Sequence, residues 1–253
     1  MNKTIVIIKK ELTDQIRSYR FFIFSIILLI FAISSPVLAK MMPEIFKSMG
    51  DQLQIQIPTP TYVDAYAQFF KNLSQMGTLV ILLIFAGIVC DEKVKGSATM
   101  ILTKNVSRTT FVVGKFLTAA LIWTAVYLVS ALICIGYAYY FFPVAPHGSL
   151  LLANVMFWLY GLLIISITLF ASTISNSHAT ATIYSFLSWI ILLITSAIPR
   201  VQKYSPSLLG AVNTEVVAGT KTLSDVYIAI ILASLLIITF VILSARSLSR
   251  QEL

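Results

Sequence analysis

A charged segment, Asp91 to Lys115, lies between two long apolar runs and holds side chains that could take part in polar chemistry. The segment carries five Lys or Arg residues, which are costly to place in hydrocarbon. It must therefore face water on one side of a membrane, and it is long enough to fold. Charged and apolar side chains on such a segment suit contact with another protein, so we predict that a partner docks here.

The rest of the chain lacks the residue patterns that bind nucleotides or metals or that catalyse hydrolysis. It has no GxxxxGK[ST] loop, no HExxH and no GxSxG sequence. Cys90 and Cys134 have no CxxC spacing, and His147 and His178 fall in loops that we place on opposite sides of the membrane. We therefore expect no metal site, no bound cofactor and no catalytic residue in this chain.

Serine and threonine are frequent in the apolar runs, above all between Ser166 and Ser188. These small residues let membrane helices pack closely and hydrogen-bond to one another, and we favour this structural role. The alternative is a polar path for a substrate, with candidate residues Ser34, Ser35, Thr78, Ser185 and Ser188. No Asp, Glu, Lys or Arg lies near the middle of a predicted span, which argues against a proton- or sodium-coupled carrier.

Composition places these residues in an all-α membrane protein. The chain is 58% hydrophobic and 11% charged, with a mean hydropathy of +0.91, whereas soluble domains carry about 25% charged residues. The apolar runs approach the length that crosses about 30 Å of hydrocarbon. We predict one transmembrane domain over residues 1–253, with six spans at about 21–41, 69–90, 111–142, 150–174, 180–198 and 226–244.

The distribution of Lys and Arg predicts the orientation. Twelve of the 18 basic residues fall in the N-terminal segment, the loop between spans two and three, and the C-terminus. Basic residues mark the cytoplasmic side, so we expect a multi-pass protein of the cell membrane with both termini in the cytoplasm. The net charge of +8 is explained in the same way, and without a basic stripe interleaved with aromatics we expect no nucleic-acid partner.

The first twenty residues have the pattern of an amphipathic helix. Ile5, Ile8, Leu12, Ile16 and Tyr19 recur on one helical face, opposite a polar face. We predict a helix that lies in the membrane interface, although a plain basic tail is the alternative. Its anchors toward the lipid headgroups would be Lys3, Lys10 and Arg17, with Lys115 as a further anchor at the start of the third span.

The longer outer loops have weaker signals. Leu53, Ile55 and Ile57 alternate with glutamines, a pattern typical of a short strand, with an irregular cap as the alternative. The segment from Arg200 to Asp225 contains apolar residues after Pro206, and we expect a short helix there that returns toward the membrane.

The polar segment itself reads as a short helix between two turns. Gly96 provides a flexible point, and Ser97–Leu102 is compatible with a helix that exposes Met100, Ile101 and Leu102. Exposed apolar side chains on such a helix suit a soluble partner that covers them. The alternative is that they pack on the protein's own N-terminal helix.

This segment resembles the loop after the second span in ABC-2 type permeases of ABC transporters. In that family the loop often reads as Glu, three residues, Gly, an apolar pair, Ser-Arg and Gly-Lys. The matching residues are Glu92, Gly96, Leu102, Ser107, Arg108, Gly114 and Lys115. Asn105 stands where the family often has Pro. The resemblance extends to Lys10-Glu11-Leu12, the six spans and Tyr204-Ser205-Pro206.

The resemblance implies a permease that forms a dimer with a second copy or a paralogue, each half bound to a cytoplasmic ABC ATPase. That partner would carry the Walker motifs and bind ATP and Mg²⁺, and residues 91–110 would form the coupling loop. The implied ATPase contacts are Glu92, Gly96, Met100, Ile101, Leu102, Ser107 and Arg108. The implied activity is export of a hydrophobic or amphipathic substrate. The alternatives are an ATP-independent secondary transporter and a membrane immunity or assembly protein.

Overall fold

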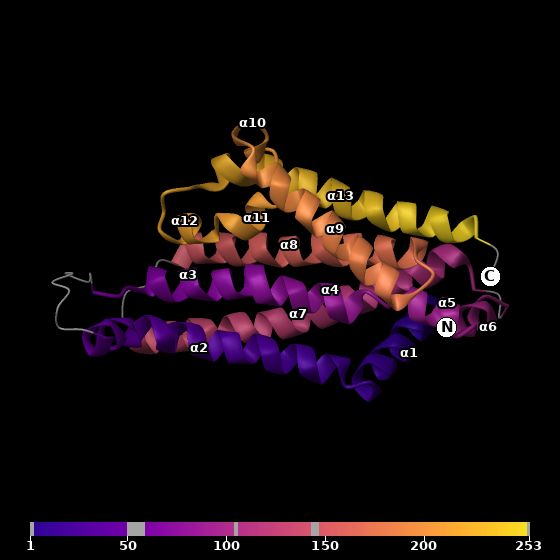
Figure 1. The fold of residues 1–253 in the computed structure, drawn as a ribbon, viewed down its shortest axis with the longest axis horizontal. Helices are drawn as coiled ribbons and strands as arrows, with labels where there is room; N and C mark the ends of the chain where they lie inside the picture. Colours follow the sequence, from indigo (N-terminus) through magenta and orange to yellow (C-terminus); the bar gives the residue numbers. More distant parts are fainter. Residues whose placement is uncertain (1–2, 50–58, 104–105, 143–146, 252–253) are drawn as a thin grey trace.

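The computed structural model describes residues 3–49, 59–103, 106–142 and 147–251, and every regular element in these ranges is helical (Figure 1). The elements are α1 (Lys3–Arg17), α2 (Arg20–Met49), α3 (Tyr62–Asn72), the π-helical turn η1 (Leu73–Gly77), α4 (Thr78–Phe85), α5 (Cys90–Val94), α6 (Ser97–Thr103), α7 (Arg108–Phe141), α8 (His147–Ile174), α9 (His178–Ala197), α10 (Pro199–Gln202), α11 (Leu208–Ala211), α12 (Asn213–Val217) and α13 (Leu223–Ser249).

Within the described ranges, six segments are long and apolar enough to cross a membrane. They are Arg20–Ile45, Tyr62–Val94, Arg108–Phe141, Ser149–Ile174, His178–Ala197 and Leu223–Ser249. The prediction of an all-α membrane protein with six spans is thus confirmed. The N- and C-terminal ends lie at the same end of the bundle, beside α5 and α6 (Figure 1). We call this the charged end.

The second span starts earlier than expected and is not one continuous α-helix. The backbone N–H and the hydroxyl of Thr61 both donate to Asp64 Oδ2, at 2.7 and 2.8 Å, and this cap starts α3 ahead of the apolar run. The π-helical turn η1 and a turn over residues 86–89 then interrupt the helix. The alternating residues Leu53, Ile55 and Ile57 lie outside the described residues.

The core lies around α8, which packs against α4, α7, α9, α11, α12 and α13. Its centre is aromatic, because Trp123 stacks on Tyr127 with ring centroids 5.0 Å apart, and Phe157 lies 5.8 Å from Tyr127. The spans formed by α9 and α13 have little buried surface within the chain. Their apolar outer faces are therefore left for lipid or for another protein.

The expected short helix between Arg200 and Asp225 is present, as α11 and α12. Both contact α8, and they bury Leu208, Leu209 and Val216. Ser74, in the second span, donates its hydroxyl proton to the carbonyl of Gly210 at 2.7 Å. The segment therefore folds back among the spans at the end of the bundle opposite the charged end.

Candidate functional site

The polar segment forms two short helices, α5 and α6, joined by a glycine turn. Gly96 has a φ of +70°, a left-handed conformation that favours glycine directly after a helix. The predicted helix after it is α6, but only part of its apolar surface is exposed. Met100 is 66% exposed, whereas Ile101 and Leu102 pack against the hydrophobic core. The expectation that all three are exposed is therefore wrong for Ile101 and Leu102.

A groove runs along α6 toward the start of α7. It has a volume of about 370 Å³ and is lined by Thr99, Leu102, Thr103, Val106, Ser107 and Arg108. Three of the residues predicted to contact an ATPase thus line one groove on α6. Whether an ATPase occupies it remains a prediction.

Glu92, on α5, lies in an ion-pair cluster rather than on the free surface. The cluster consists of Lys10, Glu11, Asp14, Glu92 and Lys115. Lys115 Nζ lies 3.0 Å from Glu11 Oε2 and 3.2 Å from Glu92 Oε1, and Lys10 pairs with Glu92 as well. Because the members come from α1, α5 and α7, the cluster ties three elements together at the charged end.

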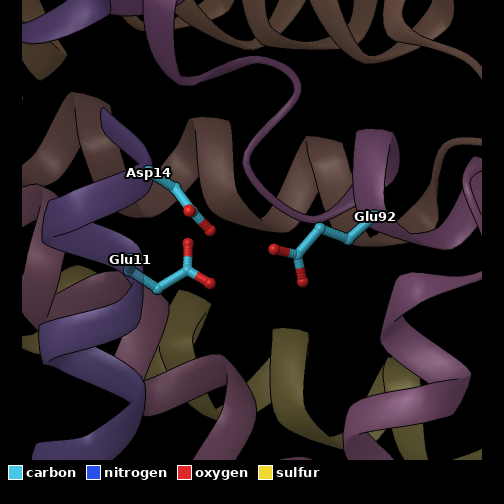
Figure 2. Close-up of side chains that lie close together, drawn as sticks. All are labelled: Glu11, Asp14 and Glu92. Carbon is cyan, nitrogen blue, oxygen red and sulfur yellow. The ribbon is translucent and has the colours of Figure 1, made fainter. Parts of the chain in front are cut away.

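The three carboxylates of the cluster converge from two sides, as Figure 2 shows for Glu11, Asp14 and Glu92. Their oxygens lie within 4.8 Å of one another, a spacing that could accommodate a cation. Lys10 and Lys115 already supply two positive charges at this point, so an ion pair network explains the arrangement. Glu92 Oε2 is buried and has no hydrogen-bond partner among the described residues, which leaves one acceptor in excess.

The charge state of Lys10 is set by its surroundings. Burial alone would lower the pKa of its ammonium group, but the bonds to Glu92 and Glu11 outweigh burial and hold the pKa above its ordinary value. Lys10 therefore stays charged at neutral pH and remains a permanent counter-ion for the carboxylates.

Lys115 differs from its expected place as an anchor toward lipid headgroups. Its side chain is only 1% exposed, because α1 covers it. Gly114 makes this cover possible: a Cβ at that position would lie 2.7 Å from Ile7 Cγ2. Of the other predicted anchors, Arg17 is exposed, and the side chain of Lys3 lies outside the described part of the structure. Lys10 belongs to the ion-pair cluster.

Ser107 and Arg108 stabilise helix ends. The Ser107 hydroxyl accepts a hydrogen bond from the backbone N–H of Thr110 at 3.1 Å and so caps the start of α7. Arg108 Nη1 donates to the carbonyl oxygens of Leu248, Ser249 and Gln251, each at 2.8 Å, at the end of α13. Both residues thus have roles within the chain, and contact of either with an ATPase stays a prediction.

A second charged contact at the same end could not be predicted from the sequence. Asp91 accepts a hydrogen bond from Arg20 Nη2 at 3.0 Å, and its other oxygen lies 2.9 Å from His178 Nδ1. These three residues join the starts of α2, α5 and α9. The only signal was the acidic pair Asp91-Glu92 itself, because its partners are 71 and 87 positions away.

The five residues named for a polar path do not form a site of their own. The hydroxyls of Ser35, Ser185 and Ser188 each donate to a carbonyl four residues earlier in the same helix. Thr78 lies 3.4 Å from the carbonyl of Leu73, and Ser34 is half-buried on α2. These bonds lie within the spans that carry the residues, so the interhelical role that we favoured and the substrate path both stay predictions.

Many of the charged side chains at the charged end take part in ion pairs and helix caps. These bonds hold α5 against the spans, and α6 packs on the core through Ile101 and Leu102. No curated protein matches the chain at a significant level. The family model described as "ABC-2 family transporter protein" matches residues 5–253. This match covers nearly the whole sequence, and the chain belongs to the ABC-2 family of transporter proteins.

Proposed function

We propose that the protein is the permease subunit of an ATP-driven exporter, powered by a separate cytoplasmic ABC ATPase. Membership of the ABC-2 family supports a membrane permease that works with such an ATPase. In this proposal the ATPase binds ATP and Mg²⁺, the permease pairs with a second copy or a paralogue, and the charged end faces the cytoplasm of the cell.

The observation that carries the proposal is the way in which α6 is attached to the rest of the protein. One face of this helix presents Met100 to solvent, while Ile101 and Leu102 pack on the core. The preceding helix is fixed by the ion pairs of Glu92. The packed apolar face of α6 and the ion pairs of α5 resist independent motion of α6. A conformational change in an ATPase bound to α6 would therefore move the spans.

A groove between α7 and α8 supports an apolar or amphipathic substrate. It has a volume of about 490 Å³. Its polar side chains bond to one another, since the Tyr127 hydroxyl donates to Asn154 Oδ1 at 3.0 Å and Trp158 Nε1 donates to Thr124 Oγ1 at 3.0 Å. A ligand in this groove would therefore meet mainly apolar side chains. The direction of transport rests on the family resemblance.

Cross-linking from α6 tests the proposal. The chain would be purified in mild detergent from its native membrane with Met100→Cys and a cysteine-directed cross-linker. Cys90 and Cys134 are buried, so the introduced thiol dominates the reaction. We expect a cross-link to a protein that mass spectrometry identifies as an ABC ATPase and that hydrolyses ATP.

The matched control is Ala218→Cys, an exposed position beside α12, away from the charged end. We expect no ATPase cross-link from this variant. The proposal fails if no ABC ATPase co-purifies, or if both cysteines cross-link to it equally. Transport that persists in vesicles without ATP would instead favour a secondary transporter.

A further inference from the structure

Two basic residues flank α6 in the sequence, and each caps the end of a different span. Lys93 precedes α6 and bonds to the last turn of α8. Arg108 follows α6 and bonds to the last turn of α13. The last carbonyl groups of a helix have no partner within it and carry partial negative charge, so cations bind there favourably. The elements on the two sides of α6, which are α5 and the start of α7, are thus each bonded to the end of another span.

The contact with α8 involves main chain as well as side chain. Lys93 Nζ donates to the carbonyls of Thr173 and Ser175 at 2.8 and 3.0 Å. The backbone N–H groups of Val89 and Cys90 both donate to Ser172 Oγ at 3.0 Å. The turn over residues 86–89 releases these N–H groups from the second span, and α8 binds them.

The contact with α13 lies in the final turn of the described chain. Arg108 Nη1 reaches three carbonyls there, those of Leu248, Ser249 and Gln251. Gln251 Nε2 in turn donates to the carbonyl of Thr173 at 3.1 Å. Thr173 therefore accepts from both Lys93 and Gln251, and this shared carbonyl links the end of α13 to the end of α8.

From this geometry we infer that Arg108 is a positioning residue that transmits the movement of α6 to α13. The C-terminal turn, Leu248–Gln251, is then part of the transmission and not a passive tail. The inference rests on the proposed function, because it needs an ATPase that moves α6. Since α13 packs along α8, a displacement that enters at Arg108 and Lys93 moves these two spans together.

Distance measurements in the complex of permease and ATPase test this role. Spin labels on Ile23→Cys in α2 and Arg246→Cys in α13, both exposed positions, report how α13 moves relative to α2. The distance distribution would be recorded by pulsed electron resonance without nucleotide and with ATP plus vanadate. The buried Cys90 and Cys134 should stay unlabelled.

The variants compared are Arg108→Gln and the matched control Arg250→Gln, which removes the same charge from an exposed residue one position after α13. We expect the control to keep the nucleotide-driven shift. In Arg108→Gln the ratio of shifted to unshifted populations should fall by about 2- to 30-fold, measured on purified complexes that contain the ATPase. Arg108→Lys should restore part of the shift, because its ammonium group still donates to carbonyls.

The outcomes separate the two proposals. If the distance between the labels on α2 and α13 in the wild-type complex does not change with nucleotide, both the proposed function and this inference are overturned. A normal shift in wild type that survives in Arg108→Gln overturns the inference alone, because a merely structural cap would change stability and not the response. Should Arg108→Gln fail to fold, Arg108→Lys and Gln251→Ala decide: a reduced shift in either supports the inference, and a full shift in both overturns it.

Discussion

Lys115 is the buried cation on which the ion-pair cluster depends, and its replacement by Met tests that dependence. Met keeps much of the side-chain length but leaves Glu11 and Glu92 with Lys10 as their remaining counter-ion. Removing one partner of a buried ion pair costs about 3–5 kcal/mol. Glu11 is 5% exposed and Glu92 17% exposed, so water and Lys10 relieve part of the cost. We expect a loss near the lower end of that range.

The assay is thermal unfolding of the detergent-solubilised protein, followed by tryptophan fluorescence. On the scale of soluble domains of this size, a loss of about 3 kcal/mol lowers the melting temperature by about 6–12 °C. The control is Lys95→Met, at an exposed position on the same polar segment, which should change stability by less than about 0.5 kcal/mol.

A double variant identifies the electrostatic part of the effect. Glu11→Gln combined with Lys115→Met removes one charge of each sign, so we expect the pair to be more stable than the sum of the single changes by at least about 1 kcal/mol. The reasoning would be refuted if Lys115→Met and Lys95→Met had the same melting temperature. It would also be refuted if the effects of Glu11→Gln and Lys115→Met on stability were additive.

Three further substitutions test the local geometry of the charged end. Gly114→Ala should push α1 away through Ile7, lower the stability by about 1–3 kcal/mol and speed amide exchange in α1. The control is Gly136→Ala, whose new Cβ meets no atom within 4 Å. It should leave amide exchange in α1 unchanged. Gly96→Ala should cost about 1–2 kcal/mol in thermal unfolding because its φ is +70°. Ser107→Ala should cost about 1 kcal/mol through loss of the α7 cap, and Ser107→Asp should retain the stability of the native protein.

Much of the fold follows from hydropathy, because the length of an apolar run and the thickness of hydrocarbon are both fixed quantities. The interruptions of the second span do not follow from it. The residues of η1 (Leu73–Gly77) are compatible with an ordinary helix, and nothing near them in the sequence shows that Ser74 bonds to Gly210 in α11. The early start of α3 was missed because polar residues such as Asp64 and Gln68 conceal a helix that extends beyond the apolar run.

The segment of the candidate site can be selected from the sequence, but its contacts within the chain cannot. Glu92, Gly96, Ser107 and Arg108 could be selected as a pattern along the chain, yet what each one bonds to depends on distant elements. Lys115 shows the limit most clearly. A basic residue at the start of a span usually marks the interface, and nothing near it in the sequence shows that Glu11, 104 positions earlier, lies against it.

That separation also sets an order for the biosynthesis of the protein. The ribosome completes α1 long before α7 exists, so the carboxylate of Glu11 has to wait for about a hundred further residues before Lys115 is made. Until then α1 lacks the surface around Gly114 on which Ile7 packs. The charged end therefore closes only after the third span has been inserted, and a nascent chain that stalls earlier leaves Glu11 of α1 and Glu92 of α5 without their buried cation.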